Sequence, residues 1–171
     1  MDRLILAEKL ESLRRCIVRI EQRRVDSAEA LAADVDAQDI LALNLTRAVQ
    51  LCVDAAVHVL ADSEQPAPAT MGEAFELLAR ERRIPEDLAM RMRAAVGFRN
   101  LAVHAYHRID WAIVHRLTHD GVEDLRAFAG CLDRLLSQRR MTVRAVAASR
   151  SNTATVSTST SVAVIQLSVI A

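Results

Sequence analysis

The stretch DAQDILALNLTRAVQLCVDAAVHVLA, residues 36–61, decides the fold class of this chain. Its apolar side chains cover most of the circumference of an α-helix, and a helix of that kind must be surrounded by other elements of the protein. The sequence therefore predicts that this segment is the central helix of a bundle. The apolar positions are Ile40, Leu41, Leu43, Leu45, Val49, Leu51, Cys52, Ala55, Ala56, Val59 and Leu60.

Further helices are predicted on both sides, where apolar residues recur at three- and four-residue spacing between charged ones. They span residues 2–24, 27–34 and 70–82, a segment that runs from Pro85 into the motif described below, and residues 110–138. Thr70 and Glu73 have the spacing of a capping box, and Gly121 is a candidate break in the last helix. The predicted fold class is all-α, an up-down bundle of four to six helices.

Composition agrees with helices packed on helices in one domain of ordinary size. The chain has 171 residues, of which 51% are hydrophobic and only 3% aromatic, with four glycines and three prolines. We assign residues 1–138 to the bundle. Residues 139–171 include a tract of Ser, Thr, Asn, Ala and Val, and we expect a disordered low-complexity tail there.

The charge balance excludes a strong non-specific hold on nucleic acid, because 22 basic and 22 acidic residues cancel. Any contact with RNA must therefore be local. Cys16, Cys52 and Cys131 are widely separated among apolar residues, which is typical of reduced core thiols in a cytoplasmic protein. The sequence shows no CxxC zinc pattern, no signal peptide and no uninterrupted apolar run of membrane-spanning length, so we expect no metal, no cofactor and no membrane.

Residues 99–110, RNLAVHAYHRID, concentrate more chemistry than any other stretch. Arg99 can donate two parallel hydrogen bonds to a phosphate, and His104 can move a proton near neutral pH. These are the minimum groups for cutting RNA without a metal. We expect His104 to take the proton from a ribose 2′-hydroxyl and Arg99 to stabilise the charge on the phosphoryl oxygens, giving a 2′,3′-cyclic phosphate. Asn100 is expected to orient His104.

A helical wheel places Arg99 and His104 about 140° apart, so they converge poorly within one helix. Either the helix ends near His104, or two chains build the site together. Ala94, Phe98, Leu101, Ala102 and Ala105 are expected to face the core of the bundle. Met92, Val96 and Val103 form a second apolar stripe on the opposite side, and we interpret that stripe as a homodimer interface.

The pattern Arg99-x4-His104-x-Tyr106, with Gly97-Phe98 before it and Ile109-Asp110 after it, resembles the HepT-like branch of the HEPN superfamily. The resemblance covers about residues 1–138. It implies an up-down bundle, a homodimer with a cleft at its interface, and metal-independent ribonuclease activity as the toxin of a type VII-like toxin–antitoxin pair. It also implies a partner, a minimal nucleotidyltransferase antitoxin that silences the toxin by attaching adenylyl groups to Tyr106.

A nucleotide on Tyr106 would place negative phosphate on the same side of the helix as Arg99, where it would compete with RNA. Two alternatives remain open. One is a non-catalytic HEPN binding or dimerisation module, which would not need an intact Arg99 and His104. The other is a helical scaffold that dimerises through Met92, Val96 and Val103.

Overall fold

The computed structural model describes residues 2–137, and every regular element in that range is helical. The elements are α1 (Arg3–Arg23), α2 (Ala28–Ala33), α3 (Val35–Leu60), α4 (Met71–Arg80), α5 (Glu86–His104), a 3₁₀ turn (Tyr106–Arg108), α6 (Trp111–Arg116), a π-helical turn (Leu117–Gly121) and helical residues 122–137. The predicted all-α class is thereby confirmed for this part of the chain.

The chain divides into two units, of which Met1–Leu132 is the first. The second begins at Asp133, and its described residues 133–137 are helical. The predicted boundary at residue 138 and the predicted disordered tail at 139–171 lie outside the described residues.

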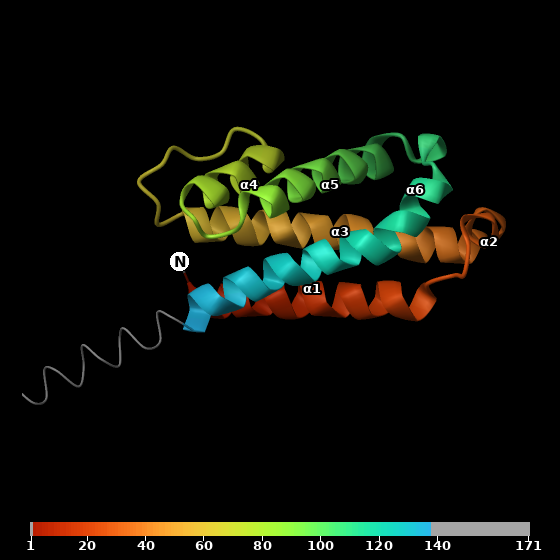
Figure 1. Cartoon of the computed structure of the whole chain (residues 1–171), viewed down its shortest axis with the longest axis horizontal. Coiled ribbons are helices and arrows are strands. Elements are labelled where there is room, and N and C mark those ends of the chain that lie inside the picture. Colours follow the sequence, from red (N-terminus) through yellow and green to blue (C-terminus); the bar gives the residue numbers. More distant parts are fainter. Residues whose placement is uncertain (1, 138–171) are drawn as a thin grey trace, which may run out of the picture. The chain divides into compact units, whose positions relative to one another are not determined.

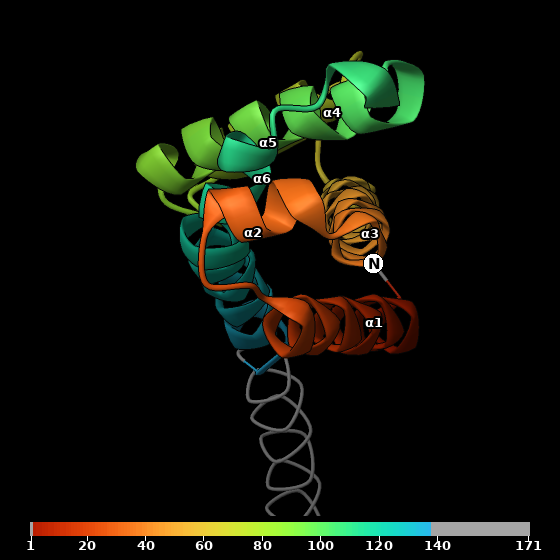
Figure 2. The same ribbon diagram turned by 90° about the vertical axis from the view of Figure 1, so that its right-hand side faces the viewer.

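Helix α3 takes the central place that its composition predicts. It packs against α1 on one side and against α4 and α5 on the other, as Figures 1 and 2 both show. Successive long helices α1, α3 and α5 alternate in direction along the bundle (Figure 1). Among the described helices, α3 alone is long and apolar enough to cross a membrane, but half of that apolar window is buried in the bundle. The same composition is typical of a buried core helix.

Polar side chains fix where the helices begin. Asp2, Ser27, Asp34 and Asp110 each accept a hydrogen bond from a backbone N–H in the first turn of the helix that follows. Thr70 does the same for the N–H of Glu73, at 3.1 Å, which confirms the predicted cap of α4. These caps satisfy backbone donors that would otherwise have no partner inside the helix.

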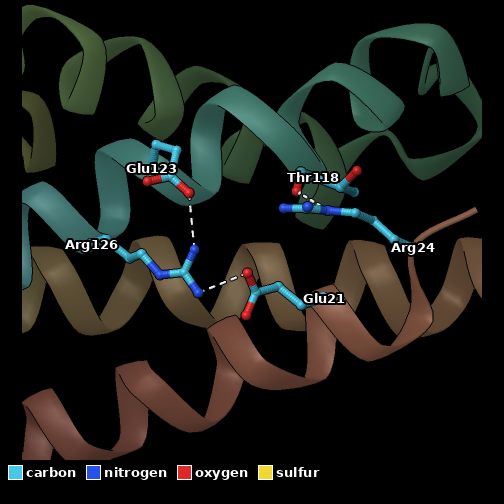
Figure 3. Close-up of polar contacts among 5 residues, drawn as sticks. All are labelled: Glu21, Arg24, Thr118, Glu123 and Arg126. Atoms are coloured by element: carbon cyan, nitrogen blue, oxygen red, sulfur yellow. Dashed lines mark hydrogen bonds and ion pairs between the residues drawn. The ribbon is translucent and has the colours of Figure 1, made fainter.

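The last predicted helix is interrupted close to Gly121, where Leu117–Gly121 form the π-helical turn. Two arginines tie this region to α1 (Figure 3). Arg24 Nε donates to the carbonyl oxygen of Thr118 at 2.6 Å, and Arg126 joins Glu21 to Glu123. At the end of the bundle that faces the viewer in Figure 2, α2 packs against α6. The bond from Arg24 gives the carbonyl oxygen of Thr118, within the π-helical turn, a hydrogen-bond partner.

Candidate functional site

The motif is divided between a helix end and a turn. Helix α5 ends at His104, and Ala105 leaves the helical region with φ −148° and ψ 50°. The 3₁₀ turn then carries Tyr106, and Ile109 behind it is buried. The helix thus ends at His104, but Arg99 and His104 both still lie within α5, so this ending does not by itself bring their side chains together. A composite site from two chains stays a prediction.

Arg99 is half-buried, and only some of its N–H groups have hydrogen-bond partners among the described residues. One of its terminal nitrogens donates to Asn100 Oδ1 at 3.2 Å, while its buried Nε has no hydrogen-bond partner among the described residues. The spacing of α5 puts Arg99 on the side that carries the buried Met92 and Val96, which explains why it is partly covered. The terminal nitrogens of the guanidinium keep further N–H groups with which it can bind an anion.

Asn100 and His104 are both exposed at the C-terminal end of α5. The structure shows Asn100 Oδ1 accepting the hydrogen bond from Arg99. The expected role of Asn100 in orienting His104 stays a prediction. The imidazole of His104 stands open to solvent at the last residue of the helix, where a substrate can reach it.

Tyr106 is held from a distant part of the chain. Its hydroxyl donates to Asp39 Oδ1 on α3 at 2.6 Å, and its ring meets the Trp111 ring edge-on with 5.8 Å between centroids. Burial, the hydrogen bond to Asp39 and the Asp39 charge raise the pKa of Tyr106 to about 12. The side chain is nevertheless 41% exposed. Tyr106 is thus a protonated phenol in a fixed position that a second protein can still reach.

Asp39 is the residue of this site that sequence reasoning missed. It lies 67 positions from Tyr106, near the start of the central helix, and its contact depends on how α3 and the 3₁₀ turn meet. The available signal was weak, since a carboxylate near the start of a helix is common there for reasons of capping and helix dipole alone.

The structure corrects the assignment of the two faces of α5. Met92 and Val96 are 1% and 8% exposed, because this side of the helix packs inside the bundle formed with α3 and α4. They belong to the core of one chain, so their assignment to a dimer interface was wrong. Val103, at 49% exposed, remains available for such an interface.

The opposite face of α5, which was expected to meet the core, is instead partly open. Ala94 is exposed, and Phe98 and Leu101 are half-buried along a groove of about 460 Å³. Ile113 and Leu117 line the facing wall of this groove. The helix that carries the motif therefore shows an apolar surface to this groove, which Met92 and the α3 residues Leu45 and Val49 also line.

The described part of the chain is an all-helical bundle that carries the Arg-x4-His-x-Tyr motif from α5 into the 3₁₀ turn, and comparison with known proteins gives its family. The family model described as ribonuclease HepT-like matches residues 13–132, which include the whole motif. The chain belongs to the HepT-like ribonuclease family of the HEPN superfamily, as the resemblance predicted.

Individual relatives agree with the family match. An mRNA nuclease HepT from Shewanella oneidensis is 32% identical over 124 residues, which span 72% of this chain and 92% of the relative. A chain in the structure of a toxin–antitoxin with AMP-PNP has a TM-score of 0.72 at 30% identity. The match covers 76% of this chain and 98% of the related chain. The structure of a tri-AMPylated HEPN toxin of S. oneidensis in complex with an MNT antitoxin also has a TM-score of 0.72 at 30% identity. The match covers 78% of this chain and 99% of the related chain.

Proposed function

We propose that this chain is the toxin of a toxin–antitoxin pair and an endoribonuclease that cuts RNA without a metal. The observation that carries the proposal is the half-buried Arg99, whose Nε has no hydrogen-bond partner among the described residues, on the same helix as the exposed His104. A guanidinium that binds an anion and an imidazole that transfers a proton are the two groups that this reaction needs. The mRNA nuclease HepT among the relatives supports the substrate class.

In the proposed reaction, His104 removes the proton from a ribose 2′-hydroxyl. The 2′-oxygen attacks the adjacent phosphorus, the bond to the 5′-oxygen breaks, and the product carries a 2′,3′-cyclic phosphate. Arg99 stabilises the charge that develops on the non-bridging oxygens, and Asn100 holds the guanidinium through the contact at 3.2 Å.

The proposed partner is a minimal nucleotidyltransferase antitoxin that attaches adenylyl groups to Tyr106. Tyr106 lies two residues after His104 and is 41% exposed, so a partner protein can reach its hydroxyl. The tri-AMPylated relative in complex with its MNT antitoxin supports this modification. A phosphate attached to Tyr106 would compete with the phosphates of RNA for the positive charge of Arg99.

We further propose that two copies of the chain form the active assembly. Val103 and the open apolar face of α5, with Phe98 and Leu101, lie on the same helix as Arg99 and His104. A two-fold contact through this helix would bring two copies of the motif to one cleft, and it would cover the apolar groove. The buried thiols Cys16, Cys52 and Cys131 fit the reducing cytoplasm as the place of action.

The test is RNA cleavage by the purified chain in the presence of EDTA. We expect cleavage by the wild type and its loss in Arg99→Ala and His104→Ala variants that melt at the wild-type temperature. Cleavage that persists in a folded His104→Ala variant would overturn the catalytic assignment. A folded wild type that binds RNA without cutting it would favour the non-catalytic HEPN module instead.

A further inference from the structure

The hydroxyl of Tyr106 does not point freely into solvent but is held against a carboxylate from another helix. Its oxygen lies 2.6 Å from Asp39 Oδ1, within the range of about 2.5–2.7 Å that is typical of an O–H group that donates to a charged oxygen. Trp111 packs edge-on against the phenol ring and restricts its rotation. The acceptor comes from the start of α3 and the donor from the turn behind α5.

We propose that Asp39 is the general base for nucleotide transfer to Tyr106: its carboxylate takes the phenol proton as the tyrosine oxygen attacks a nucleoside triphosphate. This inference rests on the proposed modification of Tyr106 and names the chain's own contribution to it. The toxin would then supply both the nucleophile and its base, while the partner enzyme supplies the bound nucleotide.

The step balances without any further reagent. A bond forms between the tyrosine oxygen and the α-phosphorus of the triphosphate, and the bond from that phosphorus to the oxygen that bridges it to the β-phosphate breaks. Pyrophosphate leaves with the bonding pair. The phenol proton moves along the existing hydrogen bond to Asp39 Oδ1 and passes from there to water.

A base is needed because the environment of Tyr106 opposes spontaneous ionisation. With a pKa raised to about 12, the phenol loses its proton in only about one molecule in 10⁵ at pH 7. Asp39 is exposed on α3, so a proton that it accepts can reach solvent. The carboxylate that accepts the phenol hydrogen bond at rest therefore stands where the proton must go during attack.

The contact between Asp39 and Tyr106 can be tested with a substitution of nearly the same shape. Asp39→Asn keeps an oxygen that can accept the Tyr106 hydrogen bond but removes the basicity, so it separates a base from a residue that only positions the ring. Asp36, about one turn earlier on α3 and also exposed, provides the matched control, because Asp36→Asn changes the charge equally at a residue that is not the acceptor of the Tyr106 hydrogen bond.

The experiment measures single-turnover transfer from ATP labelled at the α-phosphate, with the full chain and a minimal nucleotidyltransferase antitoxin of the MNT type that the related toxin binds. We expect Asp39→Asn to slow the labelling of Tyr106 by about 100-fold or more at pH 7, and Asp36→Asn to leave it unchanged. The rate of the Asp39→Asn variant should then rise about tenfold per pH unit, because only the phenolate reacts. Thermal melting confirms that both variants are folded.

Wild-type rates in a folded Asp39→Asn variant would overturn the inference and leave the proposed function intact. An equal loss in Asp39→Asn and Asp36→Asn would also overturn it, since the effect would then be one of general charge. A wild-type chain that takes up no label on Tyr106 would overturn the proposed modification itself, and this inference with it.

Discussion

The motif has a helical half, Arg99 to His104 on α5, and a turn half, Tyr106 in the 3₁₀ turn. The two halves differ in how many of their polar groups have hydrogen-bond partners within the chain. On α5, the buried Nε of Arg99 has no hydrogen-bond partner within the described part of the chain, and His104 is open to solvent. In the turn behind it, the Tyr106 hydroxyl already donates to Asp39 and its ring rests on Trp111. Under the proposed function, the groups that would bind RNA are left open, whereas the atom that would be modified is held in place. Residues that are close in sequence would thus serve two different reactions.

The largest expected effect is on the turn half of the motif. Tyr106→Phe removes the hydroxyl and keeps the ring against Trp111, so we expect complete loss of adenylylation. Mass spectrometry after incubation with the partner nucleotidyltransferase and ATP checks this, since each adenylyl group adds a fixed mass. Tyr106 is the one tyrosine of the chain, so a mass shift that persists would assign the modification to another residue type.

The next effect is on the helical half. Removing the base or the charge at the transition state should slow RNA cleavage by about 10²–10⁴-fold in His104→Ala and by about 10²–10³-fold in Arg99→Ala. Arg99→Lys keeps a charge but loses the planar fork, and we expect it to recover only part of the rate.

Two neighbours serve as matched controls for that experiment. His107 and Arg108 are exposed, have the same side-chain chemistry, and lie within nine residues of Arg99. Their alanine variants should cleave RNA within a few-fold of the wild type. Equal losses in all four alanine variants would show that the assay reports general positive charge and not the motif.

A third prediction concerns the face of α5 that the sequence assigned wrongly. Met92 is 1% exposed, so Met92→Ala should lower the free energy of unfolding by about 2–5 kcal/mol. Val103 is 49% exposed, and Val103→Ala should change the free energy of unfolding by less than about 0.5 kcal/mol. Urea unfolding at a concentration where the chain is monomeric gives both values. Similar small effects at both positions would restore Met92 to the outer surface.

The contrast between α3 and α5 shows what the sequence could and could not predict. Helix α3 is apolar around its circumference, so only a central position satisfies it, and its place in the bundle followed from composition. Helix α5 is barely amphipathic: Met92 and Val96 form one apolar stripe, and Phe98 and Leu101 form another. A helical wheel gives the angle between such stripes but not which of them meets α3 and α4.

The candidate site divides in the same way. Arg99, His104 and Tyr106 could be selected from the sequence because they lie within eight consecutive residues whose chemistry is rare elsewhere in the chain. The contact between Tyr106 and Asp39 could not, because it joins residues 67 positions apart and exists only once the turn behind α5 meets the start of α3. Tertiary contacts of isolated side chains leave no periodic pattern in a sequence.

The smallest expected effect is a change in the titration of Tyr106, and it directly tests the hydrogen bond from Tyr106 to Asp39. Because the chain has a single tyrosine, near-ultraviolet absorbance of tyrosinate reports this residue alone. The midpoint should lie at about 12, above the ordinary value of 10.0. Asp39→Asn should lower the pKa only part of the way, because burial, the largest cause, remains when the charge of Asp39 is removed.

The same shift fixes the sign of the effect on stability. The folded chain keeps the phenol proton to a higher pH than the unfolded chain, so the stabilisation is complete below about pH 10 and is lost as the pH rises toward about 12. Tyr106→Phe should lack this component of the loss. If the wild type titrated at the ordinary value, the hydroxyl would be free in solution, and the difference between the open and the held half of the motif would disappear.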